Sequence, residues 1–139
     1  MDTSKQLTII LPRSIDRLDD LRNTISAFLA ENDVSDGDVT RVEMSAYEAA
    51  VNIIEHGDVS AKNNDIMIDC HINSNEINIT MSYYGKPFDM TRVELPDLEE
   101  HYRSGKMRGL GIYFIMTLMD RVEYSHENMI STLKMIRKL

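Results

Sequence analysis

The chain has 139 residues, of which 42% are hydrophobic and 27% are charged, a composition typical of one soluble globular domain over residues 1–139. Its formal net charge of −8 argues against a protein that binds nucleic acid by neutralising phosphates, and against attraction to anionic membranes. Cys70 is the single cysteine and no apolar run approaches the roughly 20 residues of a membrane span, so we expect a disulfide-free protein in the reducing cytoplasm.

The first part of the sequence predicts one strand followed by two helices. Residues 7–11 are a short, largely β-branched run closed by a proline, which is typical of a strand. Apolar residues then recur at three- and four-residue spacing, which predicts an amphipathic helix over residues 14–31. A second helix is predicted to begin at Ser35 and Asp38, a pair suited to capping, and to end at Gly57.

The second part of the sequence predicts four strands and one apolar helix. The strands are expected at residues 65–72, 76–83, 122–124 and 132–138. A polar, lid-like segment over residues 89–108, with a short helix at 96–102, leads into the apolar helix at 110–119. Because neighbouring strands joined by tight turns pair antiparallel, the predicted fold class is an α+β two-layer sandwich rather than a doubly wound parallel fold.

Three polar side chains lie along one side of the second predicted helix. Glu48, Asn52 and His56 follow one another at four-residue spacing among Ala, Val and Ile neighbours. An asparagine oxygen can ligate Mg²⁺, and a glutamate one turn earlier can orient or deprotonate a hydroxyl near the same ion. The pattern alone also suits an exposed polar face. However, asparagine has a weak helix propensity, so helix stability does not explain its presence at this position.

A glycine-rich run opens the apolar helix. Arg108, Gly109, Leu110 and Gly111 stand at its predicted N-terminus, in a segment that is locally basic within an acidic chain. Glycines there let backbone N–H groups approach an anion, and the helix dipole favours a phosphate. The alternative is a plain flexible loop before a core helix, since two glycines alone are weak evidence.

The strand predicted at 76–83 ends in a glycine turn. Its last residues and the turn are Tyr83, Tyr84, Gly85, Lys86, Pro87, Phe88 and Asp89. Taken alone, this run is compatible with the exit of any hairpin.

Together and in this order, the three motifs resemble the ATP-binding fold of the GHKL superfamily, which includes gyrase, heat-shock chaperone, histidine kinase and mismatch-repair ATPases. More closely, they resemble the stand-alone anti-sigma-factor serine/threonine kinases of bacterial partner-switching systems. The run EAAVNIIEHG is similar to the family's first motif, and residues 96–124 look like its lid, glycine box and following helix and strand. The resemblance implies a mixed, mostly antiparallel sheet with helices on one face.

The resemblance also implies a function and a set of site residues. Glu48 would be the general base toward a serine on a small antagonist protein, and Asn52 the Mg²⁺ ligand, with ATP and Mg²⁺ as cofactors. The other nucleotide-binding residues implied are His56, Gly57, Tyr83, Gly85, Pro87, Arg108, Gly109, Leu110 and Gly111. The implied partners are a STAS-like anti-sigma antagonist and/or a sigma factor. The family often forms homodimers through the early strand and helix.

One position departs from the family pattern. The middle motif has the form Asp-x-Gly-x-Pro-Phe-Asp, and its first Asp accepts a hydrogen bond from the adenine amino group; here Tyr83 stands in its place. Losing such a bond costs about 1–3 kcal/mol. We align Ser131 with the threonine that often supports this Asp. Retained Glu48 and Asn52 favour a kinase, whereas Tyr83 favours a non-catalytic module that binds a sigma factor or antagonist without ATP; we favour the kinase.

Overall fold

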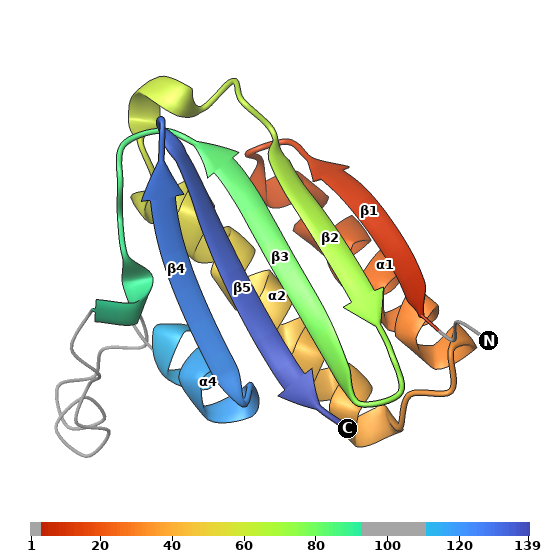
Figure 1. Cartoon of the computed structure of the whole chain (residues 1–139). Helices are drawn as coiled ribbons and strands as arrows, with labels where there is room; N and C mark the ends of the chain where they lie inside the picture. The colour runs from red at the N-terminus through yellow and green to blue at the C-terminus, as the bar shows by residue number, and fades with distance from the viewer. Residues whose placement is uncertain (1–3, 93–110) are drawn as a thin grey trace, which may run out of the picture.

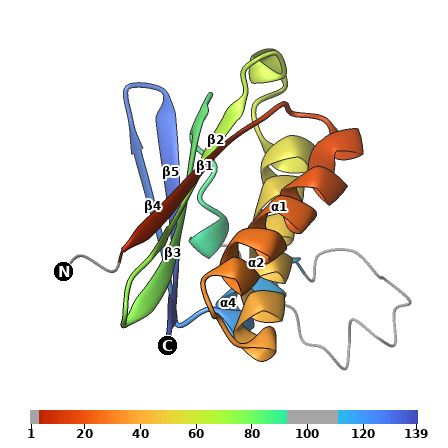
Figure 2. The ribbon, with the colours of Figure 1, turned by 90° about the vertical axis from the view of Figure 1, so that its right-hand side faces the viewer.

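The computed structural model describes residues 4–92 and 111–139, which form two layers. One layer is an antiparallel sheet of strands β1 (Lys5–Leu11), β2 (Ile66–Ile72), β3 (Glu76–Tyr84), β4 (Arg121–Glu127) and β5 (Ile130–Lys138), in the order β1-β2-β3-β5-β4. The other contains helices α1 (Leu18–Glu31), α2 (Asp36–His56) and α4 (Gly111–Leu118). Figure 1 looks onto the bare face of the sheet, and Figure 2 shows all three helices on the opposite face.

This architecture confirms the predicted fold class. Every pair of neighbouring strands among the described residues is antiparallel, and the helices lie on one face only. Because the chain passes from β3 through the segment containing α4 and β4 before β5 pairs with β3, the sheet order differs from the sequence order. This crossover brings residues 76–84 beside residues 130–138, which are distant in the sequence.

The core lies between the two layers and follows the predicted periodicities. Every second residue of β2 and β3 faces the helices and is buried: Ile66, Ile68, Cys70, Ile72, Ile77, Ile79, Met81 and Tyr83. The helices contribute buried side chains at three- and four-residue spacing, among them Leu21, Ile25 and Leu29 of α1 and Val42, Ala46 and Ala49 of α2. Each fully buried Leu or Ile stabilises the fold by roughly 1.5–3 kcal/mol, and the small alanines let α2 approach the sheet closely.

The two ends of α2 are defined by the predicted residues. Ser35 Oγ accepts a hydrogen bond from the Asp38 N–H at 3.4 Å, which confirms the predicted cap. At the other end Gly57 donates its N–H to the Ile53 carbonyl at 3.0 Å. Gly57 has an extended φ of −71°, so its role is not a left-handed turn. A Cβ there would lie 2.2 Å from the Ile53 oxygen, and this close approach is why glycine is needed.

Two boundaries differ from the prediction for local reasons. The helix predicted from residue 14 begins as a 3-10 turn (Ile15–Arg17), and the Ser14 side chain makes no capping hydrogen bond, so α1 starts at Leu18. The last two strands are longer than predicted because Asn128 and Met129 form a tight hairpin turn with positive φ values of 52° and 64°. Methionine is a rare residue in that conformation, so the sequence did not indicate the turn.

The predicted short helix at 96–102 lies outside the described residues. Within residues 4–92 and 111–139, no helix is both long enough and apolar enough to span a membrane.

Candidate functional site

The polar stripe of α2 meets the first residue of α4. A Cβ placed on Gly111 would lie 2.7 Å from Glu48 Oε2 and 3.2 Å from Asn52 Nδ2, so any larger residue would require these two side chains to move. The structure therefore brings together Glu48, Asn52 and Gly111, which come from two motifs about 60 residues apart in the sequence. This contact places a carboxylate and an amide beside a helix N-terminus. Backbone N–H groups at the start of a helix have no partner within the helix and can bind an anion.

Asn52 carries an unused polar atom at this contact. Its Nδ2 is buried and has no hydrogen-bond partner among the described residues. Buried polar groups are nearly always paired, so an unpaired one calls for an explanation such as a bound ligand or ion. The Nδ2 group is an N–H donor, which suits a phosphate oxygen beside the helix N-terminus, and the amide oxygen of the same side chain is the atom that can ligate Mg²⁺.

Glu48 is half-buried, and its environment changes its acidity. Burial raises the pKa of its carboxyl group above the ordinary value, and the charge of Glu55 raises it further, while Arg22 opposes the rise. A carboxylate with a raised pKa is a stronger base than an ordinary glutamate. The residue therefore has the chemistry expected of a general base toward a hydroxyl group.

His56 does not share the surroundings of the other two stripe residues. It is exposed at the last residue of α2, and its ring lies 6.1 Å from the Phe88 ring, centroid to centroid, at a tilt of 30°. The stripe thus divides into a half-buried part at Glu48 and Asn52 and an exposed end against the turn after β3.

The end of α2 is joined to the end of β3 by Asp58, a residue that the sequence analysis did not single out. Asp58 Oδ2 accepts the Lys86 N–H at 3.0 Å, and Oδ1 accepts the Ser60 N–H at 3.0 Å. Gly85 has a φ of +142°, and a Cβ on it would lie 2.8 Å from Asp58 Cβ, so both its conformation and its surroundings require glycine. Of the predicted residues, Gly57 and Gly85 allow close packing of the backbone around the end of α2. Pro87 is exposed in the turn after β3.

Arg13 is a second residue that sequence reasoning missed. Its Nε donates to the Asn64 carbonyl at 2.9 Å and its Nη2 donates to the Tyr84 carbonyl, so it ties the end of β1 to the ends of β2 and β3. The guanidinium lies over the Tyr83 ring, 5.9 Å from the centroid. Nothing in the local sequence around Arg13 indicates these contacts, because its hydrogen-bond partners are at least 51 residues away.

Tyr83 is buried at the end of β3, with 6% of its surface exposed, on the side that faces the helices. Burial raises the pKa of its hydroxyl to about 12. Ser131, its partner in the β3–β5 register, lies near enough to oppose that rise, but the two hydroxyls do not form a hydrogen bond of acceptable geometry. Ser131 Oγ is held instead by Tyr124 Oη at 2.9 Å and His126 Nδ1 at 2.8 Å.

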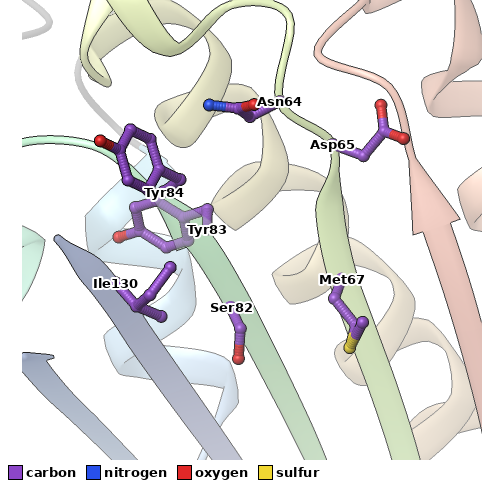
Figure 3. Close-up of a pocket in the computed structure, with 7 residues that line it drawn as sticks. All are labelled: Asn64, Asp65, Met67, Ser82, Tyr83, Tyr84 and Ile130. Carbon is purple, nitrogen blue, oxygen red and sulfur yellow. The ribbon is translucent and has the colours of Figure 1, made fainter. Parts of the chain in front are cut away.

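A separate groove lies at the same end of the sheet. It has a volume of about 660 Å³, and Figure 3 shows its lining: Asn64, Asp65, Met67, Ser82, Tyr83, Tyr84 and Ile130. Met67, Ser82 and Tyr84 alternate with the buried residues of β2 and β3, so the groove lies on the bare face of the sheet. Glu48, Asn52 and Gly111 are not part of it. Predicted residues Arg108, Gly109 and Leu110 lie outside the described residues.

The fold is a two-layer domain in which α2 and α4 meet at a polar contact. Residues 11–137 match the family model of the histidine kinase-like ATPase domain, and the chain belongs to this family. The superfamily predicted from the three motifs is therefore confirmed at the level of this domain. Among proteins with curated annotation, no sequence matches the chain.

Two solved structures share the fold at low sequence identity. The RsbU and RsbW domains of Rv1364c from Mycobacterium tuberculosis are 16% identical, with a TM-score of 0.70 over 96% of this chain and 32% of that one. The SiaB–SiaC complex from Pseudomonas aeruginosa is 14% identical, with a TM-score of 0.67 over 94% of this chain and 88% of that one. This chain thus spans about a third of the Rv1364c chain. At such identities the likeness establishes the fold.

Proposed function

We propose that the protein binds ATP with Mg²⁺ against the Glu48–Asn52 side of α2 and acts as a serine/threonine kinase of the anti-sigma-factor type. The observation that carries the proposal is the unpaired, buried Asn52 Nδ2 beside Glu48 at the N-terminus of α4. Membership of an ATPase-domain family supports the choice of nucleotide. The anti-sigma role rests on the resemblance of the three motifs.

The roles of the residues follow from their chemistry. Asn52 would hold Mg²⁺ through its side-chain oxygen, and the N–H groups around Gly111 would bind phosphate oxygens. The bound ion would neutralise phosphate charge, which is the main requirement of phosphoryl transfer. The Glu48 carboxylate would take the proton of the substrate serine while the serine oxygen bonds to the γ-phosphorus and the bond to the leaving ADP oxygen breaks.

The proposed substrate is a serine on a small, STAS-like anti-sigma antagonist, and a sigma factor is the proposed alternative partner. A protein partner is in keeping with the solved SiaB, which forms a complex with SiaC. A homodimer, as implied by the resemblance, belongs to the same proposal.

A second candidate function is a non-catalytic module that binds a sigma factor or antagonist without ATP. The observation that favours it is Tyr83, whose buried ring stands where the family has a small acidic residue. In this case the fold would serve only as a binding surface.

Calorimetric titration separates the two candidates. The protein would be titrated with ADP and with a non-hydrolysable ATP analogue in Mg²⁺, with Asn52→Ala as the site variant and Asn78→Ala, on β3, as the control. Micromolar binding that Asn52→Ala weakens and Asn78→Ala preserves supports the nucleotide site. Absence of binding to every nucleotide tested, in a folded protein, leaves the non-catalytic module.

A further inference from the structure

Four exposed apolar side chains gather at one end of the bare face of the sheet. They are Ile10 of β1, Met67 of β2, Tyr84 of β3 and Ile130 of β5, and each is between 42% and 54% exposed. The strand registers pair Ile10 with Met67 and Tyr84 with Ile130, so the four lie in two neighbouring rows across the sheet. We call them the bare-face patch. Contiguous apolar surface, unlike scattered exposed residues, marks interaction sites.

The bare-face patch includes a groove that is already formed. Three of its side chains line the groove of about 660 Å³ shown in Figure 3. Hydrogen bonds to the backbone hold the surrounding strand ends in place. Arg13 donates to the Tyr84 carbonyl, and Gly85 donates its N–H to the Met129 carbonyl at 2.8 Å. A preformed groove binds a partner at a lower entropic cost than one that must first become ordered.

Two acidic side chains flank the bare-face patch, one on each side. Asp65 precedes β2, and the β2–β3 register, continued by two residues, places it beside Tyr84. Glu127 of β4 is paired with Ile130. Both carboxylates are exposed, and neither forms a hydrogen bond or ion pair with another of residues 4–92 and 111–139. A row of acid, apolar, apolar and acid thus crosses the sheet, with the two acids three strand spacings, about 14 Å, apart.

The charge around the bare-face patch favours a basic partner. Asp65 is the one charged residue that lines the groove. The Arg13 guanidinium, which reaches the same strand ends, is engaged with the Asn64 and Tyr84 carbonyls. The net charge of −8 opposes association with a second copy of this chain or with an anionic membrane. A partner with a basic residue on each side of an apolar stripe would meet both free carboxylates.

The sheet also limits the form of that partner. The backbone groups of strands inside a sheet are bonded to neighbouring strands, so the face offers nothing to the backbone of an extended peptide. A helix satisfies its own backbone and can lay an apolar stripe into a groove. We propose that the bare-face patch docks an amphipathic helix of another protein, with a lysine or arginine at each end of the apolar stripe of that helix.

This docking surface goes beyond the proposed function and does not depend on it. Glu48, Asn52 and Gly111 belong to the helical layer, which covers the opposite face of the sheet (Figure 2). The bare-face patch could therefore be occupied whether or not a nucleotide is bound.

Fluorescence anisotropy with two designed peptides tests the docking. As a helix, KQALLQALLQAK presents a leucine stripe with a lysine at each end, the two lysines about 16 Å apart along the axis. EQALLQALLQAE presents the same stripe with acidic ends. Each peptide would carry a fluorescein label and be titrated with the intact protein. We expect the lysine peptide to bind about tenfold more tightly than the glutamate peptide.

An apolar variant and its control locate the binding. Tyr84→Ser removes one side chain of the bare-face patch and should weaken binding of the lysine peptide about tenfold. Leu139→Ser is the matched control, because Leu139 is 51% exposed and follows the end of β5 that lies opposite Ile130. Its affinity should equal that of the natural protein.

A charge-reversal pair tests the two acids. Asp65→Lys combined with Glu127→Lys should reverse the preference, so that the glutamate peptide binds more tightly. Glu31→Lys combined with Asp36→Lys changes the net charge equally at two exposed acids of the helical layer, and it should keep the natural preference. Thermal unfolding would establish that every variant is folded.

Each outcome decides for or against the docking surface. Tighter binding of the lysine peptide, weakened by Tyr84→Ser and reversed by the charge pair, supports it. Equal binding of the two peptides, binding that Tyr84→Ser leaves unchanged, or absence of binding would overturn it. Self-association on gel filtration, or sedimentation with phosphatidylcholine–phosphatidylserine vesicles, would also overturn it if Tyr84→Ser abolishes the effect, because a second copy or a lipid surface would then be the occupant. Nucleotide titration is a separate measurement, so failure of the proposed function is distinguishable from these results.

Discussion

The contact between α2 and α4, proposed as the phosphate end of a nucleotide site, differs from the Tyr83–Ser131 end of the sheet in how many polar groups the protein itself satisfies. At the phosphate end, Asn52 has an unpaired nitrogen, Glu48 carries a raised pKa, and glycine keeps the start of α4 in close contact. At the Tyr83–Ser131 end of the sheet, Ser131, Tyr124 and His126 are hydrogen-bonded to one another, and the Tyr83 hydroxyl is the one buried side-chain atom there without a hydrogen bond of acceptable geometry among the described residues.

This contrast indicates which end tolerates change. At the phosphate end, only a bound ligand would offset the free-energy cost of burying unpaired polar groups. Substitutions there should therefore affect nucleotide binding and phosphoryl transfer more than stability. The hydrogen-bonded cluster at the Tyr83–Ser131 end contributes to the fold, so substitutions there should affect stability as well.

The largest effect is expected from Glu48→Gln. If Glu48 is the general base, the rate of phosphoryl transfer to a serine substrate should fall about 10²- to 10⁴-fold. Nucleotide binding should persist, because the amide keeps the size of the side chain. Transfer would be measured with radiolabelled nucleotide and a candidate antagonist, and Glu31→Gln, an exposed acid at the end of α1, is the control. Unchanged transfer would exclude Glu48 as the base.

A methyl group on Gly111 should disrupt the contact between the two helices. In Gly111→Ala the new Cβ would meet Glu48 Oε2 at 2.7 Å and Asn52 Nδ2 at 3.2 Å, so both side chains would have to leave the positions proposed to bind nucleotide, and nucleotide affinity should fall about tenfold. Gly37→Ala is the matched control, since its Cβ would also meet the end of a side chain, that of Arg41 at 3.2 Å, but outside the proposed site. Equal affinities of the two variants would contradict the contact.

At the Tyr83–Ser131 end of the sheet, Ser131→Ala should destabilise the fold. Removing this buried hydroxyl leaves Tyr124 and His126 without their shared partner, at a cost of about 1–3 kcal/mol. Urea unfolding would measure the loss. Ser125→Ala, on the exposed side of β4, should change the free energy of unfolding by less than about 0.5 kcal/mol. A loss no larger than that of the control would show that the cluster contributes little.

The smallest effect is expected on the pH dependence of transfer. A general base acts when it is deprotonated, so the raised pKa of Glu48 moves the acid limb of the rate profile toward higher pH. Glu55→Gln removes one charge that raises this pKa, and the acid limb should therefore move back toward lower pH. Rates measured between pH 5 and 8 would show the shift, whereas an unmoved or oppositely shifted limb would contradict the coupling.

The raised pKa of Glu48 also makes the free energy of unfolding depend on pH. A carboxyl group whose pKa is higher in the folded state binds protons more strongly when folded. Its favourable contribution is present at pH values below the unfolded pKa and is lost as the pH rises through the folded value. Glu48→Gln should therefore be relatively more stable than the natural protein at pH 7 than at pH 4, as measured by urea unfolding at the two pH values.

The local elements were predictable because their signals are local. The alternation along β2 and β3, the apolar spacing of α1 and the Ser35 cap each depend on residues within a few positions of one another. The four-residue spacing likewise placed Glu48 and Asn52 on one side of α2, and the structure then set them against Gly111.

The sequence by itself determined the elements, the fold class and the candidate phosphate-binding residues. The resemblance had already placed Ser131 near Tyr83, and the β3–β5 register sets the two opposite each other. Only the tertiary structure showed that Arg13 and Tyr124, from two other segments of the chain, are also neighbours of Tyr83. It also decided that Asp58 packs against Gly85 and that His56 is exposed. A periodic pattern reports which side of an element is buried, but it contains no information about which distant side chain lies opposite.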